Sequence, residues 1–409
     1  MNGLPQRTGA AWRSNAIGAV SALIGYTVPR HVSPTVSAIR RVVVVKPASL
    51  GDVVLSSPAV AVVRAAFPTA HLSLAVGSWS RPAAQGIPNV DEVVDLGNFG
   101  TPGRFGPRDV PVAVQTLRRG GYDLAVVLDR SPLVAVAPLL AGIRWRAGID
   151  SGGRGFAHGI RVPWVTRCHE ADLYIAVARA ATSGVILPGE SAPPALSFEP
   201  GPVARTSAES LWRESGLDMP GGPIVVIHPG GASNPGMTLS SKRWPTERFA
   251  YVANALALAG IRVVLVGDRT DSLAVAAVKE AAEAPVIDLS GRADFATLAA
   301  MIARADAYLG NDSVPLHLAV AMGTPAVALY GPTDPRVYGP YAPRTGPYVG
   351  RGVALVSPNA CSQTPAFRPG PIHACPGCRC IDAIAPSDAL QAISGLLEAR
   401  RETVRIPPH

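Results

Sequence analysis

Residues 306–335, DAYLGNDSVPLHLAVAMGTPAVALYGPTDP, decide the fold of this chain. A short apolar strand ends at 310–313, Pro315 opens a helix, Gly323 follows its last turn, and a second buried strand covers 326–330. Proline in the first helical turn and glycine just past the last are the expected boundaries. Where a strand meets a helix N-terminus, free backbone N–H groups and the helix dipole favour an anion. The stretch therefore predicts a phosphate site in a doubly wound α/β domain.

The same alternation of strands and helices extends through the rest of the chain. The β-branched run 41–46 is typical of a fully buried strand. Repeated βαβ units imply parallel sheets with right-handed crossovers. The Gly- and Pro-rich stretch 97–109 is expected to be a mobile loop. Further strands are predicted at 71–76, 92–96, 123–128, 224–227, 262–266, 286–289 and 307–309, and helices at 247–259, 271–282, 295–304 and 387–400.

Prolines concentrated between 187 and 222 indicate a linker between two similar units. The chain then divides into a disordered basic tail (1–40), an N-terminal Rossmann-like domain (41–190), a linker (191–222), a C-terminal Rossmann-like domain (223–385), and a terminal helix with a tail (386–409). We therefore expect two doubly wound domains that face each other across a cleft.

Composition supports a globular protein. Of 409 residues, 48% are hydrophobic and 16% charged, which is typical of a chain rich in buried parallel strands. The net charge is +8, but six basic and no acidic residues precede Asp52, so the rest of the chain carries only about +2. We therefore expect no nucleic-acid partner.

The first 40 residues have three open interpretations: a disordered tail, a membrane-surface segment, or a signal peptide. Their apolar stretch, 16–28, is too short and too rich in Gly and Ser to span a bilayer. No later stretch is predicted to be transmembrane.

Gly51 and Asp52 follow the first strand, at the edge of the sheet where α/β proteins bind ligands. A carboxylate there can accept a proton from a hydroxyl nucleophile. The alternative is a carboxylate that only caps a helix.

In the second half, His228-Pro-Gly230-Gly231 follows a strand, and its glycines permit close approach of a ligand. Downstream, Ser240, Ser241 and Lys242 precede a helix, and hydroxyls with a cation at such a position suit a diphosphate. A solvated basic loop is the alternative.

Two further polar residues are candidates for ligand contact. Asp268 follows a strand, where a carboxylate can bind ribose hydroxyls. His317 lies on the helix after the phosphate loop and either contacts the ligand or packs in the core. Four late cysteines leave structural zinc, disulfides and free thiols open: Cys361, Cys375, Cys378 and Cys380.

Taken together, these stretches resemble glycosyltransferase family 9, the bacterial ADP-heptose:lipopolysaccharide heptosyltransferases. The resemblance spans roughly 41–400. It is carried in order by VVVVKPASLGDVVLSSPA (42–59), KRWP (242–245), GNDS (310–313) with His317, GTP (323–325) and GPTDP (331–335).

The resemblance implies a GT-B fold, with the acceptor on the first domain and a nucleotide-sugar on the second, and an inverting, metal-independent transfer. It implies that Asp52 is the general base, near Ser49 and Gly51, and that Lys242 neutralises the departing diphosphate. Donor contacts are implied for Gly230, Gly231, Ser240, Ser241, Asp268 (ribose), Asp312 (sugar), Ser313 (phosphate) and His317. No cofactor beyond the nucleotide-sugar is implied for catalysis, and structural zinc at the cysteines stays open.

Three departures from the family pattern bear on the substrates. Val314 stands where a glycine is common, Asp129-Arg-Ser-Pro replaces the usual polar segment, and residues 232–237 form an insertion before Thr238. Val314 is expected to narrow the approach to phosphate, because β-branched residues disfavour positive φ.

The favoured function is therefore transfer of a sugar from an ADP- or other NDP-activated donor to a cell-envelope glycan or glycolipid, with heptose from ADP-heptose as the favoured choice. Such an enzyme would be cytoplasmic, or peripheral on the cytoplasmic face of the inner membrane. A GT-B nucleotide-sugar epimerase or hydrolase, and a non-catalytic nucleotide-sugar-binding protein, stay open. A dehydrogenase is disfavoured, because no Gly-x-Gly-x-x-Gly follows a strand.

Overall fold

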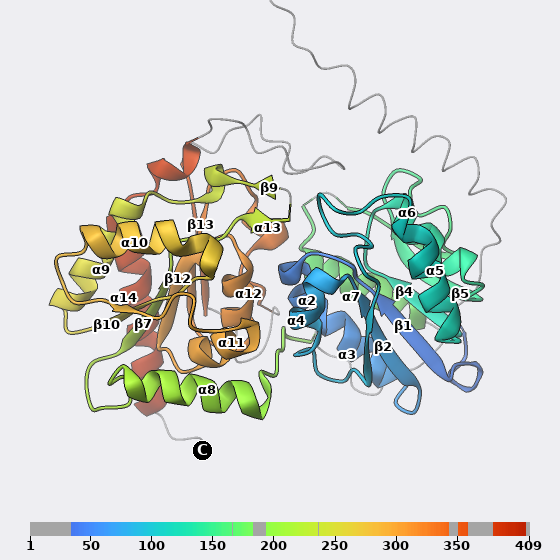
Figure 1. Cartoon of the computed structure of the whole chain (residues 1–409), viewed down its shortest axis with the longest axis horizontal. Helices are drawn as coiled ribbons and strands as arrows, with labels where there is room; N and C mark the ends of the chain where they lie inside the picture. Colours follow the sequence, from blue (N-terminus) through green and yellow to red (C-terminus); the bar gives the residue numbers. More distant parts are fainter. Residues whose placement is uncertain are drawn as a thin grey trace, which may run out of the picture.

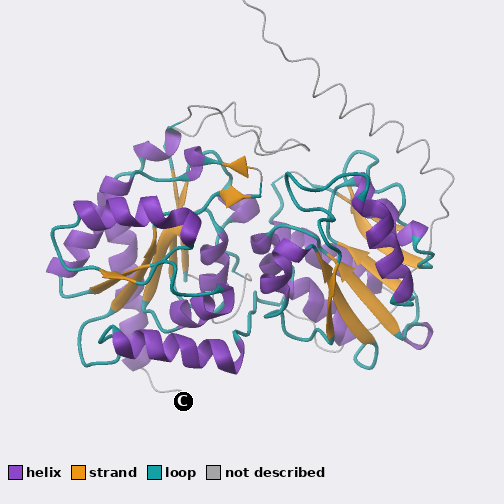
Figure 2. Ribbon diagram, in the orientation of Figure 1, coloured by secondary structure: helices purple, strands orange, loops and turns teal. Residues whose placement is uncertain are grey.

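The computed structural model describes residues 34–165, 167–182, 194–235, 237–342, 351–358 and 379–405. The chain forms two lobes, each built on a six-stranded parallel sheet covered by helices on both faces (Figures 1 and 2). The predicted α/β architecture of two doubly wound domains is therefore confirmed.

The N-terminal sheet has the strand order β3-β2-β1-β4-β5-β6, and every neighbouring pair is parallel. This order reverses direction between β1 and β4, which is the switch point where doubly wound sheets bind ligands. The strands are β1 (Arg41–Val45), β2 (His71–Val76), β3 (Glu92–Asp95), β4 (Leu124–Val127), β5 (Trp145–Asp150) and β6 (Ile160–Pro163).

The C-terminal sheet has the order β11-β10-β7-β12-β13-β14, which repeats the topology of the first. Its switch point therefore lies between β7 and β12. The strands are β7 (Ile224–His228), β10 (Arg262–Leu265), β11 (Ile287–Asp288), β12 (Ala307–Asn311), β13 (Ala326–Tyr330) and β14 (Gly352–Val356). A small antiparallel hairpin, β8 (Ser233–Asn234) and β9 (Met237–Thr238), covers most of the predicted insertion 232–237 and ends one residue beyond it.

Three strands of the two main sheets were missed by the sequence reasoning, β5, β6 and β14, as were the two short strands of the hairpin. Strand β5 contains Arg146, whose polarity hides the strand in the sequence. The Arg146 guanidinium is nevertheless buried, because it donates to the backbone carbonyls of Ile143, Arg144 and Ala157. Satisfied donors of this kind allow a charged side chain inside a sheet protein.

Helices fill both faces of each sheet. In the first lobe α3 packs on α7 and α5 on α6; in the second, α9 packs on α10 and α14, and α8 packs on α11. Helix α8 therefore belongs to the packing of the second lobe, although its residues fall in the stretch read as a linker. The helices are α2 (Leu50–Leu55), α3 (Ser57–Ala66), α4 (Arg81–Ala84), α5 (Asp109–Arg119), α6 (Pro132–Leu140), α7 (Glu170–Thr182), α8 (Gly201–Glu214), α9 (Thr246–Leu258), α10 (Ser272–Ala281), α11 (Phe295–Ala303), α12 (Val314–Ala321), α13 (Pro335–Tyr338) and α14 (Pro386–Arg405).

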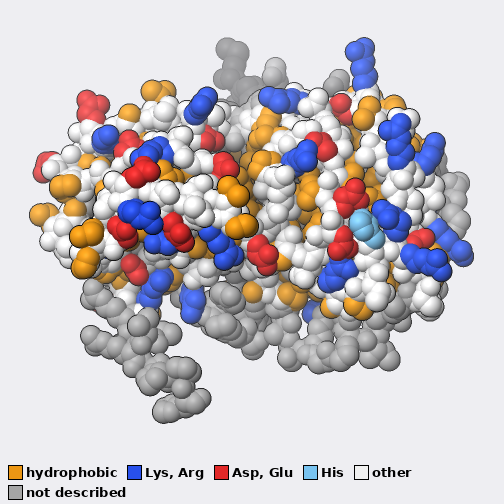
Figure 3. All heavy atoms as spheres, turned by 60° about the horizontal axis from the view of Figure 1, so that its bottom comes forward, with side chains coloured by type: hydrophobic (Ala, Val, Ile, Leu, Met, Phe, Trp, Pro, Cys, Tyr) orange, Lys and Arg blue, Asp and Glu red, His pale blue; other side chains and the backbone are white. Residues whose placement is uncertain are grey.

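The two lobes meet through short helices at the facing sheet edges. Helix α2 packs on α12, and α4 packs on α11 (Figure 1). One hydrophobic core cluster runs through this contact from the α3/α7 face of the first lobe to the α11/α12 face of the second. On the face shown in Figure 3, acidic and basic side chains are interspersed. Within the described ranges, no helix is long and apolar enough to cross a bilayer.

Candidate active site

A cavity of about 730 Å³ lies between the lobes, at the switch points of both sheets. The first lobe contributes the loop and helix that follow β1, and the second contributes the segments that follow β7, β10 and β12. Among the predicted site residues, the following line it: Ser49, Gly51, Asp52, Gly231, Lys242, Asp268, Asp312, Ser313 and His317.

Asp52 occupies the first turn of α2. Its Oδ2 accepts hydrogen bonds from the Ser49 amide (3.1 Å) and the Ser49 hydroxyl (3.3 Å), which makes a capping box. The side chain is still 26% exposed and lines the cavity. Asp52 therefore caps its own helix and remains accessible to a ligand, so a capping role does not exclude a role as proton acceptor.

Lys46, which the sequence reasoning did not single out, lies behind Asp52. Its Nζ is 3.5 Å from Asp52 Oδ2 and 3.5 Å from Asp129 Oδ2, and it also donates to the Ala48 carbonyl. The side chain is only 5% exposed. Burial alone would raise the pKa of Asp52, but Lys46 and the Ser49 amide outweigh it, so this pKa lies below its ordinary value. A lysine that ends an otherwise apolar strand was the available signal.

Arg130 follows Asp129 in the segment that departs from the family pattern. It forms an ion pair with the buried Glu170 of α7, and its guanidinium lies 5.5 Å from the centre of the Trp164 ring. Its charge also contributes to the lowered pKa of Asp52. The segment thus ties the end of β4 to α7 and surrounds Asp52 with positive charge.

His317, on α12, marks the contact between the lobes. A Cβ placed on Gly51 would lie 3.0 Å from His317 Cδ2 and 3.7 Å from Val314 Cγ2. His317 Nδ1 is buried and has no hydrogen-bond partner among the described residues. Burial, which is the largest effect, lowers the pKa of His317 to about 4. The histidine therefore stays neutral near pH 7 and both packs between the lobes and lines the cavity.

Lys242 and Asp312 form an ion pair on the second-lobe side of the cavity, across from the lobe that carries Asp52. The lysine Nζ lies 2.6 Å from Asp312 Oδ2, which also accepts a 2.6 Å hydrogen bond from the Thr333 hydroxyl. The lysine side chain is 15% exposed, and both charged residues line the cavity. Asp312 and Thr333 therefore hold a fixed cation at the cavity wall.

Three predicted donor residues are not among those that line the cavity: Gly230, Ser240 and Ser241. A Cβ on Gly230 would lie 2.1 Å from Asp271 Oδ1, so this glycine permits close packing of the loop. Gly231, with φ of +87°, lines the cavity and closely approaches Ser313. The Ser241 hydroxyl is buried without a partner in the described part of the chain.

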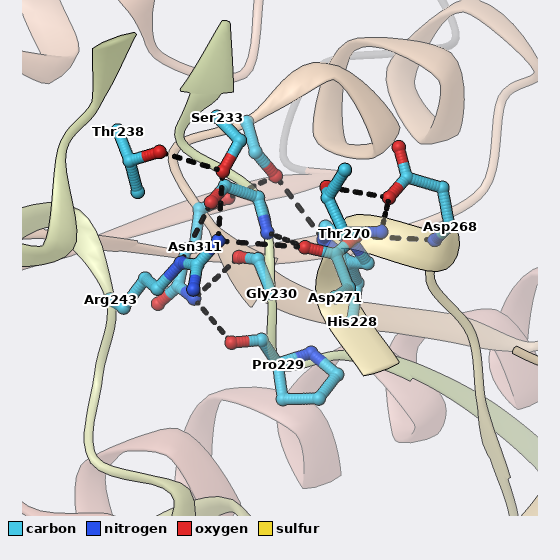
Figure 4. A network of polar contacts seen from close by, with 12 residues as sticks. His228, Pro229, Gly230, Ser233, Thr238, Arg243, Asp268, Thr270, Asp271 and Asn311 are labelled. Atoms are coloured by element: carbon cyan, nitrogen blue, oxygen red, sulfur yellow. Dashed lines mark hydrogen bonds and ion pairs between the residues drawn. The ribbon is translucent and has the colours of Figure 1, made fainter. Parts of the chain in front are cut away.

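Asp271 connects the loops that follow β7 and β10, and the sequence reasoning missed it (Figure 4). Its carboxylate contacts His228 Nε2 (3.0 Å), the Gly231 amide (2.7 Å) and the Asp268 amide (3.2 Å). Burial would raise the pKa of Asp271, but His228 and the two amides lower it to about 2. An aspartate three residues after Asp268, at the start of a helix, was the available signal.

Asp268 itself caps the turn in which it lies. Its Oδ1 accepts 2.6 Å hydrogen bonds from both the amide and the hydroxyl of Thr270, and the residue is exposed at the cavity edge (Figure 4). Its second carboxylate oxygen is not used by this cap. The position is therefore compatible with a ligand hydroxyl.

Asn311, at the end of β12, joins the loop after β7 to the segment that contains Trp244. Its Nδ2 donates to the carbonyls of Pro229 and Gly230 (3.0 Å each), and its Oδ1 accepts from the Trp244 amide (3.0 Å). The next residues lead into α12, which begins at Val314. Ser313 is its N-cap, so the helix N-terminus is directed at the cavity. Val314 has helical φ and takes part in the lobe contact.

Structural zinc, disulfides and free thiols were the three alternatives left open for the late cysteines. Three of them, Cys361, Cys375 and Cys378, lie outside the described residues, and Cys380 is buried in the short helix Cys380–Ala383. Within the described ranges, no three His, Cys, Asp or Glu side chains gather in a way that could hold a metal ion. The prediction about these cysteines therefore stays a prediction.

Curated relatives match most of the chain. It is 28% identical over 307 residues to lipopolysaccharide heptosyltransferase 2 of Escherichia coli K12, which covers 72% of this chain and 84% of the relative. Lipopolysaccharide heptosyltransferase 3 of the same strain is 26% identical over 292 residues, 69% of this chain and 80% of the relative.

Solved structures agree in fold. A family 9 glycosyltransferase from Veillonella parvula superposes with a TM-score of 0.68 at 23% identity, covering 88% of this chain and 97% of that one. The ADP-heptose lps heptosyltransferase II of E. coli gives 0.63 at 24% identity, covering 88% and 99%. The GT-B arrangement of the two lobes is therefore shared with these proteins. Residues 112–350 match the family model "Glycosyltransferase family 9 (heptosyltransferase)", more than half of the chain, so the chain belongs to this family of glycosyltransferases.

Proposed function

We propose that this enzyme transfers heptose, with inversion, from an ADP-activated donor to a lipopolysaccharide-type acceptor. The observation that carries the proposal is the meeting of Asp52 with Lys242, Asp312 and Ser313 around one cavity. A proton acceptor on one lobe and a cationic cradle on the other are what glycosyl transfer from a nucleotide-sugar requires. The matched relatives are named for heptosyl transfer to lipopolysaccharide, which supports the choice of sugar and acceptor.

Asp52 would act as the general base. As the acceptor oxygen attacks the anomeric carbon, its proton passes to the Asp52 carboxylate, and the bond from that carbon to the diphosphate oxygen breaks on the opposite face. The lowered pKa of Asp52 keeps the carboxylate ionised near neutral pH, which is the form that accepts a proton. Lys46 would hold this carboxylate without blocking its cavity side.

Lys242 would balance the negative charge that develops on the departing diphosphate. Its partner Asp312 keeps the ammonium at the cavity wall, and the N-terminus of α12 adds backbone N–H groups beside Ser313. We assign these groups the electrostatic role that a metal ion has in other transferases, so we propose a metal-independent transfer. Gly231 would let the chain approach the phosphates closely.

The remaining cavity walls suggest where the other parts of the substrates lie. Val266, Leu289 and Phe295 form an apolar end suited to the nucleotide base, with Asp268 placed for a ribose hydroxyl. On the first lobe, Trp79 and the exposed Arg104 are placed for an anionic acceptor. An acceptor of the glycolipid class would put the reaction at the cytoplasmic face of the inner membrane. Binding of the full-length protein to vesicles of anionic lipid would support this location.

Asp52→Asn tests the proposal. Asparagine retains an oxygen that accepts from Ser49, so the cap survives, but it cannot take the acceptor proton. We expect transfer to fall at least about 100-fold, as for the loss of a general base, with ADP affinity unchanged by calorimetry. Asp109→Asn, a capping aspartate in α5 away from the cavity, is the matched control. Full turnover by Asp52→Asn would remove the base role, and rapid donor consumption without any acceptor would favour a hydrolase or epimerase.

A further inference from the structure

His228 lies between two polar side chains that connect it with the cavity. Its Nε2 is 3.0 Å from Asp271 Oδ2, and its Nδ1 is 3.3 Å from the hydroxyl oxygen of Ser313. His228 and Asp271 are 2% and 4% exposed, whereas Ser313 is half-buried and lines the cavity. Asp271, His228 and Ser313 therefore form a hydrogen-bonded relay that ends at the proposed diphosphate site.

The direction of each hydrogen bond follows from its partners. The Asp271 carboxylate can only accept, so His228 carries a hydrogen on Nε2. In a neutral imidazole Nδ1 is then an acceptor, and in the described part of the chain its donor is the Ser313 hydroxyl. A second acceptor near this hydroxyl is the Asn311 carbonyl, at 3.2 Å. In both cases the hydroxyl hydrogen points into the protein, and lone pairs face the cavity.

Lone pairs facing a diphosphate are unfavourable, and protonation of His228 removes the conflict. We propose that binding of a nucleoside diphosphate takes up one proton on His228, which turns the Ser313 hydroxyl into a donor toward the phosphate. The proton comes from solvent and forms an N–H bond at Nδ1. This N–H donates to the Ser313 oxygen, the hydroxyl hydrogen turns to a phosphate oxygen, and Nε2–H stays on Asp271. The inference rests on the proposed function, which places the diphosphate beside Ser313.

The Asp271 carboxylate, which contacts His228 directly, favours this uptake. The Asp271 carboxylate faces the imidazole directly and is held rigidly, because Gly230 and Gly267 leave no space beside it. The guanidinium of Arg243, 3.7 Å from Asp271 Oδ1, acts in the opposite direction and offsets part of this attraction. Beyond Ser313, the Lys242 ammonium is already paired with Asp312. The buried Tyr308 hydroxyl lies under the same loop and is uncharged, since burial raises its pKa.

The relay also suits the proposed reaction. During transfer the acceptor proton is expected on Asp52, so the first lobe gains a proton while the diphosphate gains negative charge on the second. A protonated His228 places a positive charge one side chain away from that diphosphate. His228 and Asp271 are thus positioning residues that act through Ser313.

Calorimetric titration with ADP at pH 8, in buffers of different ionisation enthalpy, measures the protons taken up on binding. His228→Gln keeps an N–H for Asp271 but cannot titrate. We expect the wild type to take up about one proton more than this variant when ADP binds. As the pH rises in alkaline solution, the ADP affinity of the wild type should fall relative to that of the variant by up to about tenfold per pH unit. His71→Gln, at the start of β2 and away from the cavity, should match the wild type.

Nitrogen NMR of the wild-type His228 ring gives the same answer without a substitution. We expect one protonated ring nitrogen in the free enzyme and two in the ADP complex. Equal proton uptake by the wild type and His228→Gln, or an unchanged ring signal on ADP binding, would overturn the relay while leaving the proposed function intact. Absence of ADP binding to the wild-type enzyme would overturn both.

Discussion

Gly51 of the first lobe lies against the His317 ring of the second, so closely that a methyl group on Gly51 would reach within 3.0 Å of His317 Cδ2. Asp52 is the next residue in the chain, and Ser313 is the N-cap of the helix that carries His317. This contact therefore lies directly between the proposed base and the proposed phosphate site and helps to set their separation.

Gly51→Ala tests that relationship. Because the neighbouring ring must move, we expect the lobes to separate slightly and turnover to fall by about tenfold or more, as small misplacements of reacting groups do. ADP binding, which we assign to the second lobe in our proposal, should change little. Gly395→Ala on the exposed side of α14 has open space around its new methyl and serves as the control. Normal turnover by Gly51→Ala would show that the contact does not set the catalytic geometry.

Lys46→Met should change the pH dependence of transfer. Lys46 lowers the pKa of Asp52, and a general base fails as pH falls through its pKa, so the acidic limb of kcat/KM should move to higher pH in the variant. Activity should approach that of the wild type in alkaline solution.

Asp129→Asn provides the reciprocal test of Lys46. The lysine then serves Asp52 alone, so the acidic limb should move to lower pH. In a double variant with Lys46→Met and Asp129→Asn, the two opposite shifts of the acidic limb should partly cancel. If Lys46→Met lowers kcat/KM equally at every pH, Lys46 does not act through the ionisation of Asp52.

Asn311→Asp should damage the donor loops although it adds no bulk. Asn311 is fully buried and donates to two carbonyls, so a carboxylate there would face the oxygens of Pro229 and Gly230. We expect a loss of about 2 kcal/mol or more in the free energy of unfolding, and weaker ADP binding.

Asn254→Asp is the matched control for Asn311→Asp. The Asn254 side-chain oxygen accepts from the amides of Glu283 and Ala284, a role that a carboxylate performs equally well. Urea denaturation should therefore show little change for this variant. Similar losses for both substitutions would mean that donation by Asn311 is not what holds the loops.

His158 should make the first lobe sensitive to acid. It is fully buried, and neither ring nitrogen has a hydrogen-bond partner among the described residues. Burial, then the charges of Arg146 and Arg161, lowers its pKa from 6.5 to about 3. A folded-state pKa below the unfolded value means that stability is full above pH 6.5 and is lost as pH falls from there toward 3.

His158→Leu should therefore flatten the acid side of the stability profile. Between pH 7.5 and 5 we expect the wild type to lose about 2 kcal/mol more than the variant, measured by urea denaturation at both pH values. The other histidines are present in both proteins and cancel in the comparison. Parallel losses in the two proteins would show that His158 is not the acid-sensitive group.

The positions of most buried strands along the chain could be predicted from the sequence, because strands of a parallel sheet are continuous apolar runs, as in 41–46 and 326–330. Strand β5 was not readable, because Arg146 is satisfied by carbonyls that only the folded chain brings to it. The same limit applied to Asp271, whose partners His228, at the end of β7, and Gly231, just after it, are distant in sequence.

The amino-acid sequence by itself determined that the chain forms two doubly wound units, and which loops would stand at their ligand-binding edges, because hydrophobic periodicity and helix boundaries are local properties. The tertiary structure alone decided that Lys46 lies behind Asp52, that Asp271 joins the donor loops, and that Gly230 and Ser240 stand back from the cavity. Those relationships depend on burial, distance and charge between segments far apart in the chain. They form only when both sheets have folded and their helices have packed on them.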